Sequence, residues 1–269
     1  MGEQPRLARA ALHFWEEPCI SGKRGSGTVF FSGCSLRCVF CQNREISEKG
    51  FGADVSVERL REIFDQLVDK GAHNINLVNP THFVPAIAQA LERPLPVPVV
   101  YNTGGYDRVE ALRCLEGKIQ VYLPDMKYAL PGPASRYSGA PDYPEVARAA
   151  ILEMVRQTGP YRLDEEGMLT SGVLIRHLIL PRNLENTRRV IDWVAGTFPS
   201  GTVLFSLMSQ YTPCGDLSRV PEIDRRLTRR EQEAAEEYLF VSGIEDGFVQ
   251  ERDSAAEEYI PPFDLTGVV

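Results

Sequence analysis

The sequence predicts an α/β fold in which buried strands alternate with amphipathic helices along the chain. Short apolar runs rich in β-branched residues recur at intervals, and the apolar residues between them follow the three-and-four spacing of helices. The length of 269 residues suits a single α/β barrel. We therefore expect right-handed strand–helix–strand crossovers and a mainly parallel sheet.

Six segments have the composition of buried strands. They are residues 28–32, 75–79, 98–102, 119–125, 173–180 and 202–208. Six strand–helix units are fewer than the eight that close a full barrel. The expected fold is therefore a partial, open (β/α)6 barrel of the TIM type, with its site at the C-terminal ends of the strands.

Helices are expected between these strands. The apolar spacing predicts helices over residues 57–68, 83–91, 109–115, 146–155 and 184–194. A last helix is expected to begin at Thr228, where Glu231 completes a capping box, and to continue through Leu239. Residues 161–169 interrupt the alternation and are predicted to form a small inserted hairpin.

We expect one domain over residues 1–269, because the sequence shows no internal repeat, low-complexity tract or linker. Its core barrel should span about residues 25–243. Residues 1–24 form an N-terminal lead, and residues 244–269 form a C-terminal tail that we expect to pack across the barrel.

Composition and charge exclude several classes of protein. Hydrophobic residues make up 43% of the chain, which is enough for a packed core. The 29 Lys and Arg residues against 37 Asp and Glu residues give a net charge of -8, so we expect no nucleic-acid partner. The sequence has no signal-peptide pattern and no apolar run near the roughly 18 residues of a membrane span. The expectation is a cytoplasmic protein without membrane contact.

Three of the six cysteines lie within eight residues, directly after the first predicted strand: Cys34, Cys38 and Cys41. In a chain without an export signal, such thiols suit metal binding better than disulfides. A zinc site usually has four ligands, and the other three cysteines stand alone in the sequence. Three thiolates without a fourth suit a [4Fe-4S] cluster with one open iron. A zinc site and coincidental core cysteines are the alternatives.

This spacing resembles the motif of the radical S-adenosylmethionine (SAM) superfamily, in which an aromatic residue, here Phe40, precedes the last of three cysteines. Residues 27–43 resemble the pyruvate formate-lyase activating enzymes. Glu16 and Glu17, followed by residues 20–22, are similar to an activating-enzyme-like branch of that group. The likeness continues through residues 208–213 to residues 248–252.

The resemblance implies one [4Fe-4S] cluster per chain, with Cys34, Cys38 and Cys41 as its ligands and SAM bound at the open iron. Electron transfer from the reduced cluster would cleave SAM to a 5'-deoxyadenosyl radical, which takes a hydrogen atom from the substrate. The cofactors carry this chemistry, while the protein orients them. A flavodoxin or ferredoxin is the implied electron donor, because the sequence shows no second cluster or flavin motif.

Polar residues at successive strand ends are candidates for SAM binding. The resemblance implies that Lys127 reaches the SAM carboxylate and that Arg176 reaches the ribose or carboxylate side of SAM. An internal ion pair between Lys127 and Asp125 is the alternative role for this lysine. The full set of cofactor-binding candidates is Phe40, Asn79, Thr81, Asn102, Thr103, Asp125, Lys127, Arg176 and Met208.

The sequence departs from the activating enzymes at the end of the second strand. Those enzymes usually have a Gly-Gly-Glu type motif there to hold the SAM amino group, whereas residues 79–82 read Asn-Pro-Thr-His and contain no carboxylate. Thr81 and the Asn79 carbonyl are the acceptors available in this stretch. His82 and His177 are interpreted as structural histidines, and Cys214 is the one isolated cysteine expected at the same rim.

Three functions are compatible with these observations. The first is a radical SAM enzyme that takes hydrogen from a protein substrate, as a glycyl-radical activating enzyme does. The second is a radical SAM enzyme that modifies a small molecule. The third is a non-enzymatic iron–sulfur or zinc protein. The sequence assigns no catalytic residue and does not name the substrate.

Overall fold

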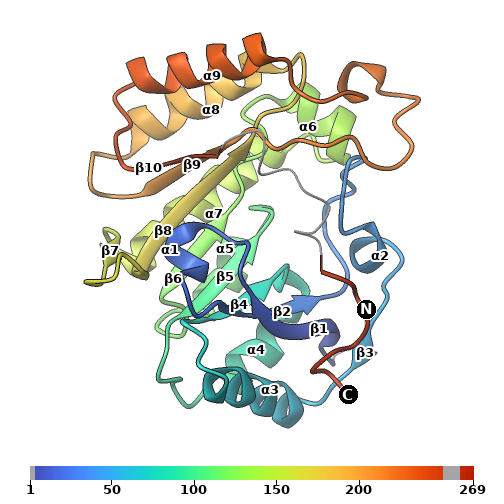
Figure 1. Cartoon of the computed structure of the whole chain (residues 1–269), viewed down its shortest axis with the longest axis vertical. Helices are drawn as coiled ribbons and strands as arrows, with labels where there is room; N and C mark the ends of the chain where they lie inside the picture. Colours follow the sequence, from blue (N-terminus) through green and yellow to red (C-terminus); the bar gives the residue numbers. More distant parts are fainter. Residues whose placement is uncertain (1–3, 251–260) are drawn as a thin grey trace.

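The computed structural model describes residues 4–250 and 261–269. All six predicted strands are present and are mutually parallel in the order β9-β8-β6-β5-β4-β2 (Figure 1). The sheet is open, so the predicted α/β, partial-barrel fold is confirmed. The strands are β2 (Ser26–Phe31), β4 (Ile75–Val78), β5 (Val99–Thr103), β6 (Val121–Pro124), β8 (Leu169–Leu178) and β9 (Leu204–Met208).

Further strands extend the sheet into the lead and the tail. β1 (Arg6–His13) lies antiparallel to β2, and β3 (Ala53–Asp54) lies antiparallel to β1. At the other edge, β10 (Gly247–Gln250) lies parallel to β9. The predicted hairpin is formed by β7 (Arg162–Leu163) and the start of β8. β1 contains three alanines and two arginines, and β10 has only four residues, so neither has a clear strand pattern.

The predicted helices are present between the strands. Ser56 caps the first long helix, and the capping box of Thr228 and Glu231 begins the last. None of the helices in the described part of the chain is long and apolar enough to cross a membrane. The helices are α1 (Pro18–Ser21), α2 (Arg44–Ser47), α3 (Val57–Asp69), α4 (Val84–Ala90), α5 (Val109–Arg113), α6 (Pro131–Ser138), α7 (Tyr143–Thr158), α8 (Leu184–Thr197) and α9 (Arg229–Val241), with short 3-10 turns at Thr81–Phe83 and Pro221–Ile223.

The lead closes one end of the barrel. α1 places Cys19 and Ile20 in an apolar cluster with side chains from β5, β6, β8 and β9. The residues of these strands in the cluster are Val100, Val121, Leu123, Leu169, Leu174 and Leu204. Because these positions lie toward the strand N-termini, α1 seals the end of the barrel opposite the cysteine loop.

The described part of the tail, residues 261–269, lies along β1. Its backbone pairs with this strand through Ala10 N to Thr266 O at 2.8 Å and Leu265 N to Ala8 O at 3.0 Å. Arg9 also forms an ion pair with Asp264 at 2.7 Å. Residues 251–260 of the tail lie outside the described residues.

Candidate cluster and cofactor site

The three clustered cysteines lie in the loop after β2, at the C-terminal edge of the sheet. Cys34, Cys38 and Cys41 line one pocket of about 530 Å³. The Asn79 side chain, just after β4, donates a hydrogen bond to the carbonyl of Gly33 and ties the start of this loop to the neighbouring strand. Asn79 has a φ of 59°, a left-handed conformation in which asparagine is enriched.

The donor set fits an iron–sulfur cluster. Cys38 Sγ lies 3.0 Å from Ser138 Oγ, and Cys41 Sγ lies 3.3 Å from Ser47 Oγ. Burial raises the pKa of Cys34, and raises that of Cys38 to about 11, so a bound cation is needed to favour the thiolates. Within residues 4–250 and 261–269, no three His, Cys, Asp or Glu side chains converge on one ion position. Thiols spread around a pocket suit a cluster of several irons.

The loop after β9 packs against the cysteine loop. The Phe40 ring meets the Tyr211 ring edge to face, with centroids 5.7 Å apart. Cys214 Sγ lies 3.8 Å from the carbonyl oxygen of Cys41, so this cysteine is at the same rim. The other two isolated cysteines lie elsewhere: Cys19 is in the apolar cluster around α1, and Cys114 is exposed at the end of α5.

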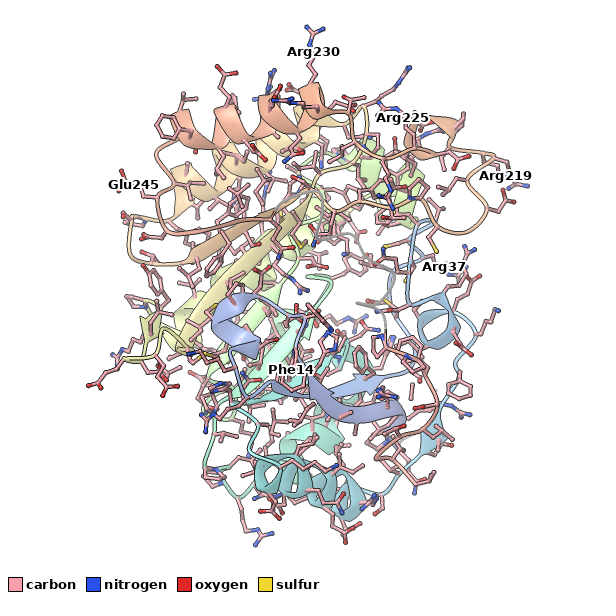
Figure 2. All side chains as sticks on the ribbon, viewed as in Figure 1. Phe14, Arg37, Arg219, Arg225, Arg230 and Glu245 are labelled. Carbon is pink, nitrogen blue, oxygen red and sulfur yellow. The ribbon has the colours of Figure 1, made fainter. Side chains whose placement is uncertain are left out.

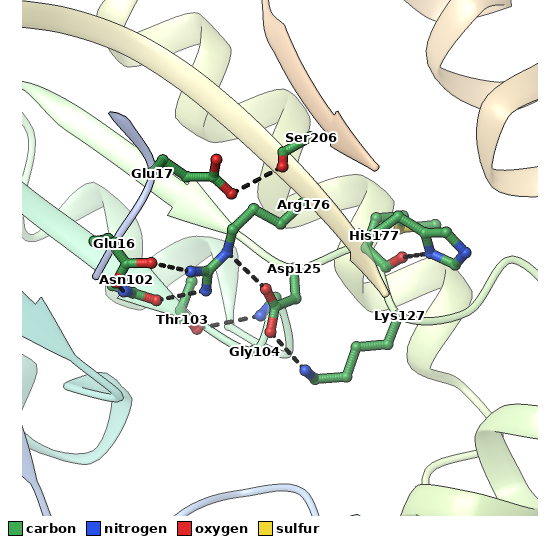
Figure 3. Close-up of polar contacts among 12 residues, drawn as sticks. Glu16, Glu17, Asn102, Thr103, Gly104, Asp125, Lys127, Arg176, His177 and Ser206 are labelled. Carbon is green, nitrogen blue, oxygen red and sulfur yellow. Dashed lines mark hydrogen bonds and ion pairs between the residues drawn. The ribbon is translucent and has the colours of Figure 1, made fainter. Parts of the chain in front are cut away.

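Arg176, on β8, is the centre of a polar network inside the barrel (Figure 3). Its guanidinium donates to Glu16 Oε1 at 2.7 Å, Asn102 Oδ1 at 2.8 Å and Asp125 Oδ1 at 3.0 Å. Asn102 in turn donates to Glu16 Oε2 at 2.8 Å. Burial opposes the charge on Arg176, but Asp125 and Glu16 outweigh it and raise its pKa. Three of the predicted cofactor-binding residues are therefore in direct contact.

Lys127 forms the ion pair with Asp125 that was the alternative to a SAM contact. Its Nζ lies 2.5 Å from Asp125 Oδ2, and 22% of the lysine side chain is exposed. Burial alone would raise the pKa of Asp125, but Arg176 and Lys127 lower it overall. Asp125 is therefore a carboxylate with two cationic partners, and its ionised form does not depend on Lys127 alone.

A glycine turn and a buried tyrosine hold the backbone at Asp125. Gly105 has a φ of 80°, and a Cβ there would lie 2.2 Å from the Asp125 carbonyl oxygen, so a larger residue does not fit. The hydroxyl of Tyr143 lies 2.8 Å from the Gly104 carbonyl and 2.7 Å from the Asp125 carbonyl. It also accepts a hydrogen bond from the Lys127 backbone N–H at 2.9 Å.

A carboxylate that sequence reasoning missed lies beside Thr81 and Thr103. Asp107 accepts hydrogen bonds from Thr81 at 2.8 Å, Thr103 at 2.6 Å and Tyr101 at 3.0 Å. Burial raises the pKa of Asp107, and the three hydroxyls oppose that effect. Residues 79–82 contain no carboxylate, but the fold brings one to them from the loop after β5. Asp107 lies in the loop beyond the end of β5, so the pattern of polar residues at strand ends did not identify it.

Two glutamates of the lead also enter the barrel, although the sequence analysis assigned them no contacts. Glu16 joins the Arg176 network. Glu17 is 1% exposed and accepts hydrogen bonds from Ser206 at 2.8 Å and Gln250 at 2.7 Å. Both glutamates directly precede α1, whose packing in the apolar cluster fixes their position.

The remaining predicted site residues differ in their surroundings. Met208 lies at the end of β9, where its backbone oxygen accepts a hydrogen bond from Ile179 at 3.0 Å. His177 is buried, with Nδ1 2.7 Å from the Met126 carbonyl and Nε2 3.0 Å from Thr187 Oγ1. Burial lowers the pKa of His177 to about 4, so the ring is neutral near pH 7 and structural. Burial also lowers the pKa of His82.

A family model supports the interpretation of the cysteine loop. Residues 28–115 match the model of the radical SAM superfamily. The match begins in β2, includes the three cysteines, and ends just after α5. This segment of the chain therefore has the sequence pattern of radical SAM enzymes, whose cofactors are a [4Fe-4S] cluster and SAM.

One curated protein is similar to this chain in sequence. The chain is 30% identical over 235 residues to the uncharacterized protein MJ0674 of Methanocaldococcus jannaschii, covering 83% of this chain and 64% of that protein. It thus spans a little under two thirds of this curated relative.

Two solved structures share the fold. A radical SAM methyltransferase from Sphaerobacter thermophilus has a TM-score of 0.52 at 14% identity, covering 85% of this chain and 69% of that one. Streptococcus suis SuiB bound to precursor peptide SuiA has a TM-score of 0.51 at 13% identity, covering 81% of this chain and 46% of that one.

Proposed function

We propose that this protein is a radical SAM enzyme that takes a hydrogen atom from a protein or peptide substrate, in the manner of a glycyl-radical activating enzyme. The observation that carries the proposal is the position of Cys34, Cys38 and Cys41 around one pocket at the strand C-termini, within the segment that matches the radical SAM model. When bound, the cluster and SAM supply the reductive cleavage that forms the 5'-deoxyadenosyl radical.

The residues of the chain would bind and orient these cofactors. The three cysteines would hold the cluster, and Asn79 fixes the start of their loop through Gly33. Phe40, packed on Tyr211, would border the cofactor. The remaining SAM contacts that we propose are Asn79, Thr81, Asn102, Thr103, Asp125, Lys127, Arg176 and Met208.

The cofactor contacts of Lys127 and Arg176 would add to existing ion pairs. Lys127 is partly exposed, so its ammonium is accessible to the carboxylate of SAM while paired with Asp125. Arg176 already donates to three residues, so its contribution is to fix Asp125 and Asn102. Asp107, beside Thr81, supports a site for an ammonium group near residues 79–82.

A protein or peptide substrate is favoured by one comparison. The fold is shared with SuiB, which has been solved with its precursor peptide. Small-molecule modification is the second candidate, because a shared fold does not fix the substrate. The charged interior around Arg176 supports this second candidate, because buried polar groups suit a small polar ligand.

We also propose an external flavodoxin or ferredoxin as electron donor, with the whole chain acting as one domain in the reducing cytoplasm. Arg6, Arg37 and Arg44 line the cysteine pocket, although the chain as a whole is acidic. Arg37 and Arg219 point outward on the same side of the molecule (Figure 2). Basic side chains beside the cluster suit an acidic donor protein.

The test is reductive SAM cleavage by the anaerobically reconstituted protein. With dithionite and SAM, we expect 5'-deoxyadenosine from the wild type and none from Cys34→Ala, Cys38→Ala or Cys41→Ala. Cys214→Ala is the matched control, because this thiol lies beside the same loop and should leave turnover intact. A fully loaded wild-type cluster that yields no 5'-deoxyadenosine, or stoichiometric zinc in place of iron, would overturn the proposal.

The kind of substrate is tested with deuterium. Cells grown in deuterated medium supply labelled protein and small-molecule fractions, and each fraction is incubated with the enzyme and unlabelled SAM. Deuterium in 5'-deoxyadenosine from the protein fraction supports a protein substrate. Deuterium from the small-molecule fraction alone would favour the second candidate.

A further inference from the structure

Glu17 is a buried carboxylate with one satisfied oxygen and one unsatisfied oxygen. Its Oε1 accepts hydrogen bonds from Ser206 Oγ and Gln250 Nε2. Its Oε2 is buried and has no hydrogen-bond partner among the described residues. A buried, ionised carboxylate oxygen without a partner carries a large desolvation cost. This arrangement points to a donor that the described residues do not provide.

A second unsatisfied acceptor belongs to the same chain of hydrogen bonds. Gln210 donates through Nε2 to Gln250 Oε1, and Gln250 donates to Glu17. Gln210 Oε1 is also buried and without a partner in the described part of the chain. The hydrogen bonds of Gln250 therefore connect two side chains whose free atoms are both acceptors, a carboxylate oxygen and an amide oxygen.

Among the described residues, Arg176 is the cation that acts on Glu17, and it makes no hydrogen bond to Glu17. All three nitrogens of the Arg176 guanidinium already donate, to Glu16, Asn102 and Asp125. Figure 3 shows Glu17 beside Ser206 and apart from that row of contacts. Lys127 pairs with Asp125. Within this network the carboxylates of Glu16, Glu17 and Asp125 exceed the two cations by one, so the interior has an uncompensated negative charge when Glu17 is ionised.

We propose that Glu17 and Gln210 form a substrate subsite for a cationic group rich in N–H donors, an amine or a guanidinium. Ser206 and Gln250 hold the two acceptors in place from β9 and β10. The inference rests on the proposed function, since it describes what the radical enzyme would act on. It narrows the substrate to one with a basic group, such as a lysine or arginine side chain of a peptide.

Two probes of similar shape test whether binding depends on the positive charge of the ligand. n-Butylguanidinium and neutral n-butylurea have nearly the same size, and only the first carries a charge. Each is titrated calorimetrically into the anaerobically reconstituted protein with SAM bound. We expect n-butylguanidinium to bind, n-butylurea to bind at least tenfold more weakly, and Glu17→Gln and Gln210→Leu each to weaken n-butylguanidinium at least tenfold. Glu166→Gln, at an exposed site on the β7–β8 hairpin, is the control and should not change it.

Thermal stability separates a subsite from a structural carboxylate. If Glu17 is kept for a ligand, Glu17→Gln removes an uncompensated buried charge, so the melting temperature should stay equal or rise. A lower melting temperature for Glu17→Gln, with unchanged n-butylguanidinium binding in Gln210→Leu, would assign Glu17 to the fold and overturn the proposal.

Two other outcomes would also overturn it: equal affinity for both probes, and displacement of SAM by n-butylguanidinium, which would assign the subsite to the cofactor. Failure of the proposed function is distinguishable, because it appears as absence of 5'-deoxyadenosine from the wild type without any probe.

Discussion

Asp125 is the residue on which the two cations of the barrel interior meet. Lys127 and Arg176 both donate to it, so neither is its only partner. This double pairing changes what a substitution is expected to do. Removal of one partner from a buried ion pair usually leaves a costly unpaired charge, but here the other cation stays.

Lys127→Met should therefore retain the fold and the cluster while weakening SAM binding. Loss of a charge-assisted contact to the SAM carboxylate should cost about 1 to 3 kcal/mol, or roughly tenfold or more in affinity. SAM titration into the reconstituted variant, beside a thermal melt, measures both quantities. Asn102→Ala and Arg176→Ala should also weaken SAM binding.

Arg229→Ala is the control for Lys127→Met, because Arg229 is an exposed residue of α9 paired with Glu233. Unchanged SAM affinity in Lys127→Met together with a large fall in melting temperature would show that the lysine serves only Asp125. Unchanged affinity at Lys127, Asn102 and Arg176 alike would mean that the cofactor lies elsewhere.

His177 should make stability depend on pH. Burial lowers its folded-state pKa to about 4, from the usual histidine pKa of 6.5. As the pH falls, His177 is therefore protonated in the unfolded chain before it is protonated in the folded one. Its contribution to the free energy of unfolding is full above pH 6.5 and is lost as the pH falls from 6.5 toward 4. At pH 5.5 the loss should be about 1.4 kcal/mol relative to pH 7.5.

Urea unfolding of the wild type and His177→Asn at the two pH values isolates this contribution, because other titrating groups are common to both proteins. The wild type should lose more stability than the variant as the pH falls. An equal loss in both proteins would show that His177 does not stay neutral in the fold.

At this scale the sequence predicted the cysteines and most polar strand ends, because their spacing is local. It did not predict that Glu16 would reach Arg176, 160 positions away, or that Asp107 would accept from Thr81. Those contacts depend on how the lead and the loop after β5 fold onto the sheet, which no local pattern encodes.

Among the elements, the short helix α1 contributes to both the apolar and the polar parts of the barrel interior. Its four residues place Ile20, with no exposed surface, against the inward side chains of the parallel strands. The same element orients Glu16 and Glu17, so its packing affects the polar interior as well as the apolar one. The sequence analysis predicted no helix in this segment, because four residues are too few to show a helical period.

Ile20→Ala should destabilise the protein by about 3 kcal/mol, because it removes buried methylenes and leaves a cavity. Urea unfolding measures the change, with Leu152→Ala on α7 as the control, since Leu152 is 48% exposed. Equal effects of the two substitutions would contradict the role of α1 as a packed seal of the barrel.

The start of α9 gives a second prediction at the scale of elements. Thr228 accepts from the Glu231 backbone N–H at 3.3 Å, and the Glu231 side chain accepts from the Thr228 backbone N–H at 2.9 Å. Thr228→Ala should cost about 1 kcal/mol. Thr228→Ser, which retains the hydroxyl, should cost less in the same unfolding experiment, and equal losses would show that the cap does not stabilise the helix.

Across the whole molecule, the barrel has an apolar end sealed by α1, a polar interior around Arg176, and a cysteine loop at the opposite edge. The six parallel strands could be predicted from their apolar runs, and with them the edge at which the site lies. The extension of the sheet by β1 and β10 could not, because both strands are stabilised by pairing with neighbours distant in sequence.

The most direct test of the central claim, a cluster held by three cysteines with one iron open to SAM, is Mössbauer spectroscopy of protein reconstituted with 57Fe. Spectra are recorded with and without SAM. We expect SAM to shift the signal of a single iron of the [4Fe-4S] cluster while the cysteine-bound irons stay unchanged. Spectra that are identical with and without SAM, or a protein that takes up no iron, would contradict the claim.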